Sequence, residues 1–119
     1  MDERMKQELI EWGVTWDELS DRFLGNEALM TRFMFKFLTD TSFADLSKYL
    51  NDKNAEEAFK ACHTLKGVTS NLSLDAMQKE VMELTEILRA GSLEDSEELF
   101  KTIEVKYNSL MTILKKYAD

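Results

Sequence analysis

Residues 54–71 read NAEEAFKACHTLKGVTSN, and this stretch decides the predicted fold. Asn54 is a suitable N-cap, two glutamates follow it in the first turn, and no proline interrupts the stretch. Ala58, Cys62 and Leu65 recur at helical spacing and give one face that can pack. The sequence therefore predicts an amphipathic helix over residues 54–71, with Cys62 as a small core residue.

The same predicted helix carries a polar strip on its other side. His63 and Gly67 are four residues apart, and Lys66 and Ser70 fall on the same side. A glycine inside a helix lowers the stability of the helix by about 1 kcal/mol relative to alanine, so the presence of Gly67 requires an explanation. We expect it to provide clearance beside the imidazole of His63, and the alternative is the close approach of another backbone.

This strip suits phosphoryl transfer to His63, the only histidine in the chain. An uncharged imidazole can attack phosphorus, and a lysine one turn away can hold the phosphoryl oxygens by its charge. The reaction requires little beyond positioning and charge stabilisation. We therefore predict His63 as the phosphoacceptor, Lys66 as the phosphoryl-stabilising residue and Gly67 as the position of steric clearance. An inert surface histidine is the alternative.

Helical patterns continue on both sides of this stretch. Short helices are expected at about 2–11 and 15–23, and longer ones at 27–39 running on into 43–51, at 74–90 and at 93–117. Their apolar stripes are expected to form the core, with Leu29, Phe33 and Phe37 as one example. Short connections make neighbouring helices antiparallel. The prediction is a single all-α domain over 1–119: short N-terminal helices over 1–23, and an up-down antiparallel four-helix bundle over 26–118.

Composition excludes several function classes. The chain has 119 residues, with 15 lysines and arginines against 23 aspartates and glutamates, which gives a net charge of −8. Such an acidic chain repels phosphate backbones, so nucleic-acid binding is not expected. A single cysteine and a single histidine argue against a disulfide framework and a metal site. No apolar run is long enough to span a membrane and the start lacks a signal peptide, so we expect a cytoplasmic protein, by default a monomer.

Residues 61–72, ACHTLKGVTSNL, resemble the signature of histidine-containing phosphotransfer (HPt) domains, in which small residues precede a His-x-Leu-Lys-Gly element. The resemblance spans about residues 12–117 and includes further segments: 24–27, 37–40 and the helix start at 54–55. Two positions depart from the family pattern. Ser73 stands where the family often has glycine, and we expect it to cap the helix at 74–90. Glu80 stands at an often apolar position, and we expect Val81 to carry the stripe instead.

The resemblance implies a phosphohistidine carrier that has no kinase activity of its own. Family members accept a phosphoryl group from the aspartyl phosphate of a response-regulator receiver domain and pass it to the aspartate of another receiver. His63, Lys66 and Gly67 match the family's phosphorylated histidine, assisting lysine and open position. The receiver-docking face is expected to include Phe59, Lys60 and Ser70. No cofactor is expected in this chain, because Mg²⁺ and the acidic pocket belong to the receiver.

Two other functions stay open at this point. The first is a non-phosphorylated adaptor on the same bundle, although the intact set of His63, Lys66 and Gly67 argues against it. The second is the phosphoacceptor domain of a larger histidine kinase. The chain lacks glycine-rich ATP-binding motifs, so we expect no kinase activity within it. The start at Met1 and the lack of a trailing linker favour a free-standing protein, with receiver domains and a hybrid histidine kinase as expected partners.

Overall fold

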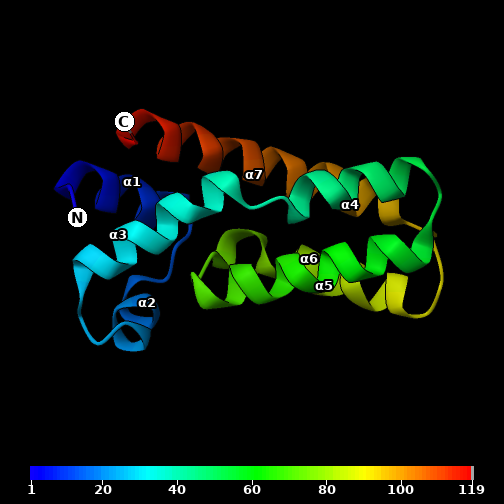
Figure 1. Ribbon diagram of the computed structural model, residues 1–119, viewed down its shortest axis with the longest axis horizontal. Helices are drawn as coiled ribbons and strands as arrows, with labels where there is room; N and C mark the ends of the chain where they lie inside the picture. Colours follow the sequence, from blue (N-terminus) through cyan, green and yellow to red (C-terminus); the bar gives the residue numbers. More distant parts are fainter. Residues whose placement is uncertain (119) are drawn as a thin grey trace.

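A computed structural model describes residues 1–118, and within this range it contains helices, turns and loops but no strand. The all-α class predicted from the sequence is confirmed. In chain order the elements are α1 (Glu3–Trp12), α2 (Trp16–Arg22), α3 (Glu27–Lys36), a 3-10 turn η1 (Phe37–Thr39), α4 (Ser42–Asn51), α5 (Ala55–Asn71), α6 (Asp75–Arg89) and α7 (Ser96–Tyr117) (Figure 1).

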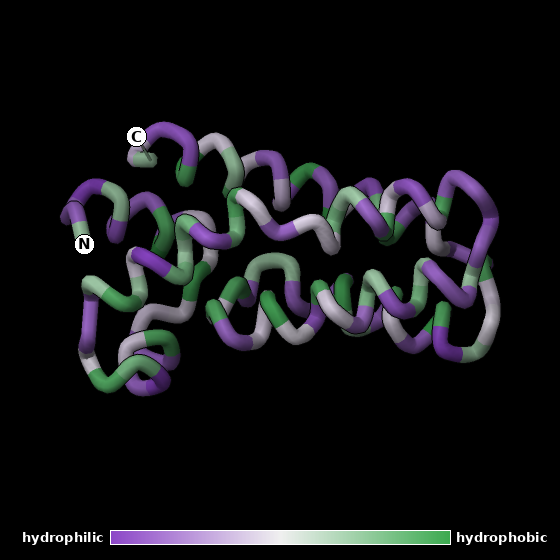
Figure 2. The backbone as a smooth tube through the Cα atoms, viewed as in Figure 1, coloured by the Kyte–Doolittle hydropathy of each residue, from purple (hydrophilic) through white to green (hydrophobic). Residues whose placement is uncertain are grey.

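The helices α4 to α7 run along the long axis of the molecule, and each reverses the direction of the one before it (Figure 1). Helix α5 packs against α4 and α6, and α6 also packs against α7. Hydrophobic and hydrophilic residues alternate along each of these helices (Figure 2), as expected for helices that bury only one face. On α5 the buried residues include Ala58, Cys62 and Leu65, the face predicted from their spacing.

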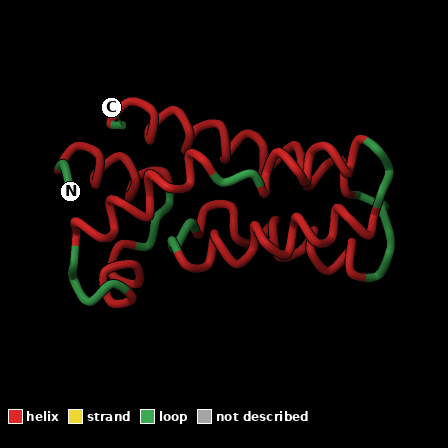
Figure 3. The backbone as a smooth tube through the Cα atoms, viewed as in Figure 1, coloured by secondary structure: helices red, strands yellow, loops and turns green. Residues whose placement is uncertain are grey.

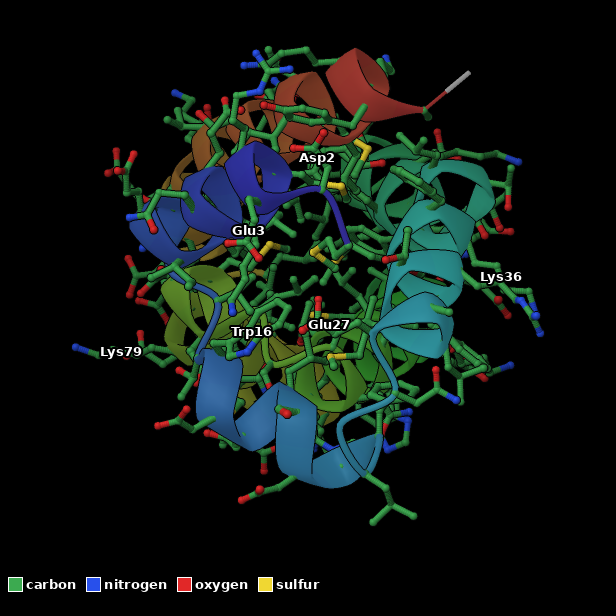
Figure 4. The ribbon with its side chains drawn as sticks, turned by 90° about the vertical axis from the view of Figure 1, so that its left-hand side faces the viewer. Asp2, Glu3, Trp16, Glu27, Lys36 and Lys79 are labelled. Carbon is green, nitrogen blue, oxygen red and sulfur yellow. The ribbon has the colours of Figure 1, made fainter. Side chains whose placement is uncertain are left out.

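The N-terminal helices cover one end of the molecule. Helix α1 packs on α7, and α2 packs on α3. Met5 and Leu9 of α1 are almost completely buried, and the indole N–H of Trp12 donates to the carbonyl of Lys106 at 2.9 Å. Figure 4 looks onto this end and shows α1, α2 and α3 around an interior filled with carbon and sulfur atoms. This packing explains why α1 and α2 form, although neither of these two helices is long enough to be stable as an isolated helix.

The prediction that residues 27–51 supply one continuous bundle helix is wrong. Helix α3 ends at Lys36, η1 follows, and a short extended segment precedes α4 (Figure 3). A carboxylate oxygen of Asp40 accepts from the backbone N–H of Ser42 at 2.9 Å and also binds its hydroxyl. This local bonding competes with helix continuation and starts a new helix at Ser42.

The last helix also begins later than expected. The predicted start was residue 93, whereas α7 starts at Ser96. Asp95 has a φ of 62°, in the left-handed region, so the helix cannot extend back through it.

Gly13, at the end of α1, is a position where side-chain volume should be costly. It has a φ of 129°, and an added Cβ would lie 2.5 Å from the Cβ of Ala76 on α6. We predict that Gly13→Ala lowers the free energy of unfolding by about 2–4 kcal/mol, from backbone strain together with overpacking. Urea denaturation measures this loss. Gly25→Ala is the control, since its φ is 74° but no atom lies within 4 Å of an added Cβ. An equal loss in the two variants would contradict the packing argument.

Candidate functional site

Helix α5 holds the predicted site rigidly, because its start is well capped. The side-chain oxygen of Asn54 accepts from the backbone N–H of Glu57 at 3.1 Å, which confirms Asn54 as the N-cap. Glu57 also pairs with Lys60, one turn along, at 3.1 Å. His63 lies in the middle of this 17-residue helix, where the backbone is fixed by hydrogen bonds in both directions. The side chain of His63 therefore extends from a backbone that the helix holds in a fixed conformation.

The structure brings the predicted strip together on the solvent side of α5. His63, Gly67 and Ser70 are exposed, and Lys66 is half-buried beside them. The flanking residues Cys62 and Leu65 are completely buried on the other side of the helix. The imidazole therefore stands at the surface, as the spacing predicted.

Gly67 leaves open space beside this histidine. A Cβ added at Gly67 would meet no atom within 4 Å, apart from the helix's own nearby backbone. The alternative explanation, close packing of another backbone against this glycine, is therefore excluded. In a helix, side chains lean toward the N-terminus and cover the turn before their own Cα. The missing side chain of Gly67 consequently uncovers the turn that carries His63.

Phe59, predicted for the docking face, is the aromatic neighbour of His63. Its ring centroid lies 5.7 Å from that of the imidazole, with the planes tilted by 49°. The guanidinium of Arg89, at the end of α6, lies 4.9 Å from the Phe59 centroid on the ring face. Arg89 also pairs with Glu86 at 3.0 Å. The sequence analysis did not identify Arg89, because its proximity depends on the register between two antiparallel helices.

Ser70 is tied to α6 through Gln78, a second residue that the sequence analysis did not identify. The side-chain amide of Gln78 donates to the hydroxyl oxygen of Ser70 at 2.6 Å. The hydroxyl of Thr69 donates to the side-chain oxygen of Gln78. The same hydroxyl lies 3.0 Å from the backbone carbonyl oxygen of Lys66. These bonds fasten the second half of α5 to α6 next to the strip.

The two lysines of this face have different surroundings. The exposed Lys60 binds Glu57, and the hydrogen bond to that carboxylate raises the pKa of the Lys60 ammonium. Within residues 1–118, the ammonium of Lys66 has no carboxylate at ion-pair distance. The charge of Lys66 is thus not neutralised by a carboxylate, whereas that of Lys60 is partly neutralised by Glu57.

Cys62 lies beneath the strip and is structural. Its sulfur is completely buried, 3.2 Å from the hydroxyl of Thr85 and 3.6 Å from the carbonyl oxygen of Val81. Burial raises the pKa of the Cys62 thiol to about 11, so it remains protonated and unreactive near neutral pH. This agrees with its prediction as a core residue.

A groove of about 270 Å³ lies between the C-terminal part of α5 and the segment from α2 to η1. We call it the aromatic groove; its apolar lining comprises Phe23, Phe33, Phe37, Val68 and Leu72. The sequence analysis placed Phe33 in the core, and this is wrong, since Phe33 is 39% exposed and packs its ring against Phe23 at 5.5 Å. The core stripe of α3 runs instead through Met30 and Met34.

Ser73 follows the site-bearing helix and occupies a left-handed turn, with a φ of 52°. Its hydroxyl accepts from Arg22 at 2.8 Å and the residue is fully buried. The prediction that Ser73 caps the next helix is wrong, because Leu74 occupies the N-cap of α6 and makes no side-chain bond. The backbone geometry explains why glycine suits this position. Val81 is fully buried, which confirms that it carries the apolar stripe of α6.

No group of three or more histidine, cysteine, aspartate or glutamate side chains is arranged to hold a metal ion within residues 1–118. No helix in the described part of the chain combines the length and the hydropathy that crossing a bilayer requires.

Comparison with known proteins agrees with the site. The family model of the Hpt domain matches residues 33–114, which is more than half of the chain and includes α5 with its polar strip. No curated protein matches the chain, and no solved structure does so either. Hpt domains are phosphocarrier modules of phosphorelay signalling that interact with receiver domains. By this match, and with a solvent-exposed histidine on a helical scaffold, the chain belongs to the Hpt domain family.

Proposed function

We propose that the protein carries a phosphoryl group on His63 between receiver domains. A ring nitrogen of the uncharged imidazole attacks the phosphorus of a receiver's aspartyl phosphate. The new P–N bond forms as the bond from phosphorus to the carboxylate oxygen breaks, and the aspartate leaves as a free carboxylate. The second ring nitrogen keeps its proton. The reverse reaction with a second receiver returns His63 to its starting state.

One observation carries this proposal: the only histidine of the chain is exposed next to a glycine that leaves its surroundings open. In-line attack needs room on the far side of the phosphorus for the departing aspartate and its domain. Lys66 supplies positive charge for the phosphoryl oxygens as they gain negative charge. An adaptor that carries no phosphate would need neither the open position nor the unmatched lysine.

The proposal extends to the surroundings of the site. Phe59, Lys60 and Ser70 lie around His63 and would contact the receiver. We propose that Mg²⁺ is held by the receiver, that this chain needs no cofactor and that it has no kinase activity. We further propose that it works in the cytoplasm as a monomeric single domain, in which α4 to α7, together with α3, correspond to the family's four-helix bundle.

Label transfer tests the function. An isolated receiver domain is phosphorylated on its aspartate with radioactive acetyl phosphate, freed of excess reagent and mixed with the protein. We expect label to appear on this chain, to be lost in acid and to survive alkali, as a phosphorus–nitrogen bond requires. Acid-stable label, or no label from any of a panel of receivers, would count against the carrier role.

Lys66→Ala should slow transfer without abolishing it. Removal of one preorganised charge from a reacting phosphoryl group costs about ten- to a hundredfold in rate, somewhat below the loss of an oxyanion donor in a closed site. Rapid-quench measurement of label transfer at saturating receiver gives the rate. The matched control is Lys101→Ala on α7, which removes an equal charge from an exposed lysine paired with Glu97 at 3.3 Å. Equal rates for the Lys66 variant and the wild-type protein would remove Lys66 from the mechanism.

A further inference from the structure

Gln78, near the start of α6, bridges two neighbouring hydroxyl groups at the C-terminal end of α5. The two helices lie side by side along the bundle (Figure 1). The side-chain amide of Gln78 donates to the hydroxyl oxygen of Ser70 at 2.6 Å, and its side-chain oxygen accepts from the hydroxyl of Thr69. Both polar ends of one side chain therefore hold the same turn of α5.

Apolar packing joins α5 to α6 independently of this bridge. Cys62, Leu65 and Val81 are completely buried in one core cluster, and the sulfur of Cys62 lies 3.6 Å from the carbonyl oxygen of Val81. The bridge lies at the edge of this interface, where Ser70 is exposed and Gln78 is half-buried. Hydrogen bonds that replace bonds to water add little net stability. The bridge is therefore better explained by the orientation that it gives to α5.

The bridged turn is the one that carries Lys66. The hydroxyl of Thr69 lies 3.0 Å from the backbone carbonyl oxygen of Lys66 and also donates to Gln78. Because a hydroxyl has a single proton, Gln78 competes with this carbonyl for it. Threonine hydroxyls that bond back to a carbonyl of the preceding turn often bend helices. Gln78 therefore opposes a bend of α5 at Lys66.

The same turn is weakly held by the helix itself. Gly67 directly follows Lys66, and α5 ends at Asn71. Glycine loses more conformational freedom on folding than other residues, and helix ends fray. Within residues 1–118, no carboxylate lies at ion-pair distance from the ammonium of Lys66 to hold it. The position of this ammonium therefore depends on the backbone of the turn.

We propose that Gln78 is a positioning residue for phosphoryl transfer, which acts through Lys66. By bridging Thr69 and Ser70, it holds the turn that carries Lys66 and so fixes the place of the Lys66 ammonium beside the phosphoryl group on His63. This inference rests on the proposed phosphocarrier function. The bonds that form and break in the transfer are the same with and without the bridge.

Replacement of Gln78 by leucine, a residue of similar length, removes both hydrogen bonds. A displacement of about 1 Å can cost about a hundredfold in rate, and a smaller one costs less. For Gln78→Leu we therefore expect about a tenfold lower rate of label transfer at saturating receiver, with an unchanged half-saturating receiver concentration. Rapid-quench measurements use the phosphorylated receiver that labels the wild-type protein fastest. Gln78→Ala should show the same loss, and it provides the test if the leucine variant does not fold.

Combination with Lys66→Ala distinguishes positioning from a general structural effect. If Gln78 acts through Lys66, Gln78→Leu should slow transfer in the wild-type background but should cause no further loss in the Lys66→Ala background. A general weakening of the bundle would slow transfer equally in both backgrounds. Equal slowing in the two backgrounds would therefore overturn the positioning role.

A matched control and the wild-type protein make the remaining outcomes distinguishable. Gln7→Leu makes the same substitution at an exposed glutamine of α1, which donates to Glu11 at 3.4 Å, and should transfer at the wild-type rate. Circular dichroism and urea denaturation verify that each variant is folded. If no receiver labels the wild-type protein at His63, the carrier function and the positioning role both fail. If a receiver does label it, a wild-type rate in the folded Gln78 variants overturns the positioning role alone.

Discussion

His63→Gln should abolish phosphoryl acceptance and leave the fold intact. The substitution removes the only imidazole of the chain, and glutamine has no comparable nucleophile. His63 is exposed, so its replacement by a good helix former should change the free energy of unfolding by no more than about 0.5 kcal/mol. Label transfer from a phosphorylated receiver, together with circular dichroism and urea denaturation, measures both effects.

The binding of the receiver provides the control for this variant. His63→Gln should still bind an unphosphorylated receiver about as tightly as the wild-type protein, because the contacts around the site remain. Retention of acid-labile label on the variant would place the phosphoacceptor elsewhere. Loss of both label and helicity would instead show that His63 is needed for folding, contrary to its exposed position.

Gly67→Leu should give a more stable protein that transfers phosphate poorly. A helical glycine costs about 0.5–1 kcal/mol relative to alanine, and leucine is nearly as favourable in a helix as alanine. Apart from the helix's own nearby backbone, no atom lies within 4 Å of a Cβ added at Gly67, so a side chain can start from this position without a clash. The leucine side chain would lean over the turn that carries His63 and displace the incoming phosphoryl group. A displacement of about 1 Å can cost about a hundredfold in rate, and we expect a loss of this size.

Two further variants isolate the cause. Gly67→Ala should gain the same stability but slow transfer less, since its single methyl group blocks less space. Ser109→Leu adds an equal apolar side chain at an exposed position of α7 and should not affect transfer. Unfolding curves and rapid-quench transfer rates are compared across the three. A wild-type rate in Gly67→Leu would show that the open space has no role in the reaction.

The sequence alone predicted the polar strip of α5 because every residue in it lies on one helix. Spacing within α5 places His63, Lys66 and Gly67 on one side whatever the rest of the chain does. The buried side of α5 followed from the same periodicity. The role of each residue depends on chemistry with a partner, and helical spacing does not encode that partner.

The features that the sequence did not reveal depend on contacts between helices. Arg89 and Gln78 come from α6, and their proximity to the site follows from the register of α6 against α5. Phe33 fits the apolar stripe of α3 by spacing, but the α2–α3 turn leaves its ring at the surface of the groove. Left-handed backbone at Leu24 and Ser73 was equally unpredictable, because these residue types seldom adopt it.

Nitrogen NMR of the imidazole tests the central claim most directly. His63 is the only histidine, so labelling with ¹⁵N-histidine gives a protein with a single pair of ring nitrogen signals. After transfer from a phosphorylated receiver, we predict that one of these signals shifts and shows a one-bond coupling to phosphorus. Phosphate present on the chain with both ring nitrogen signals unchanged would contradict the assignment of His63 as the phosphoacceptor.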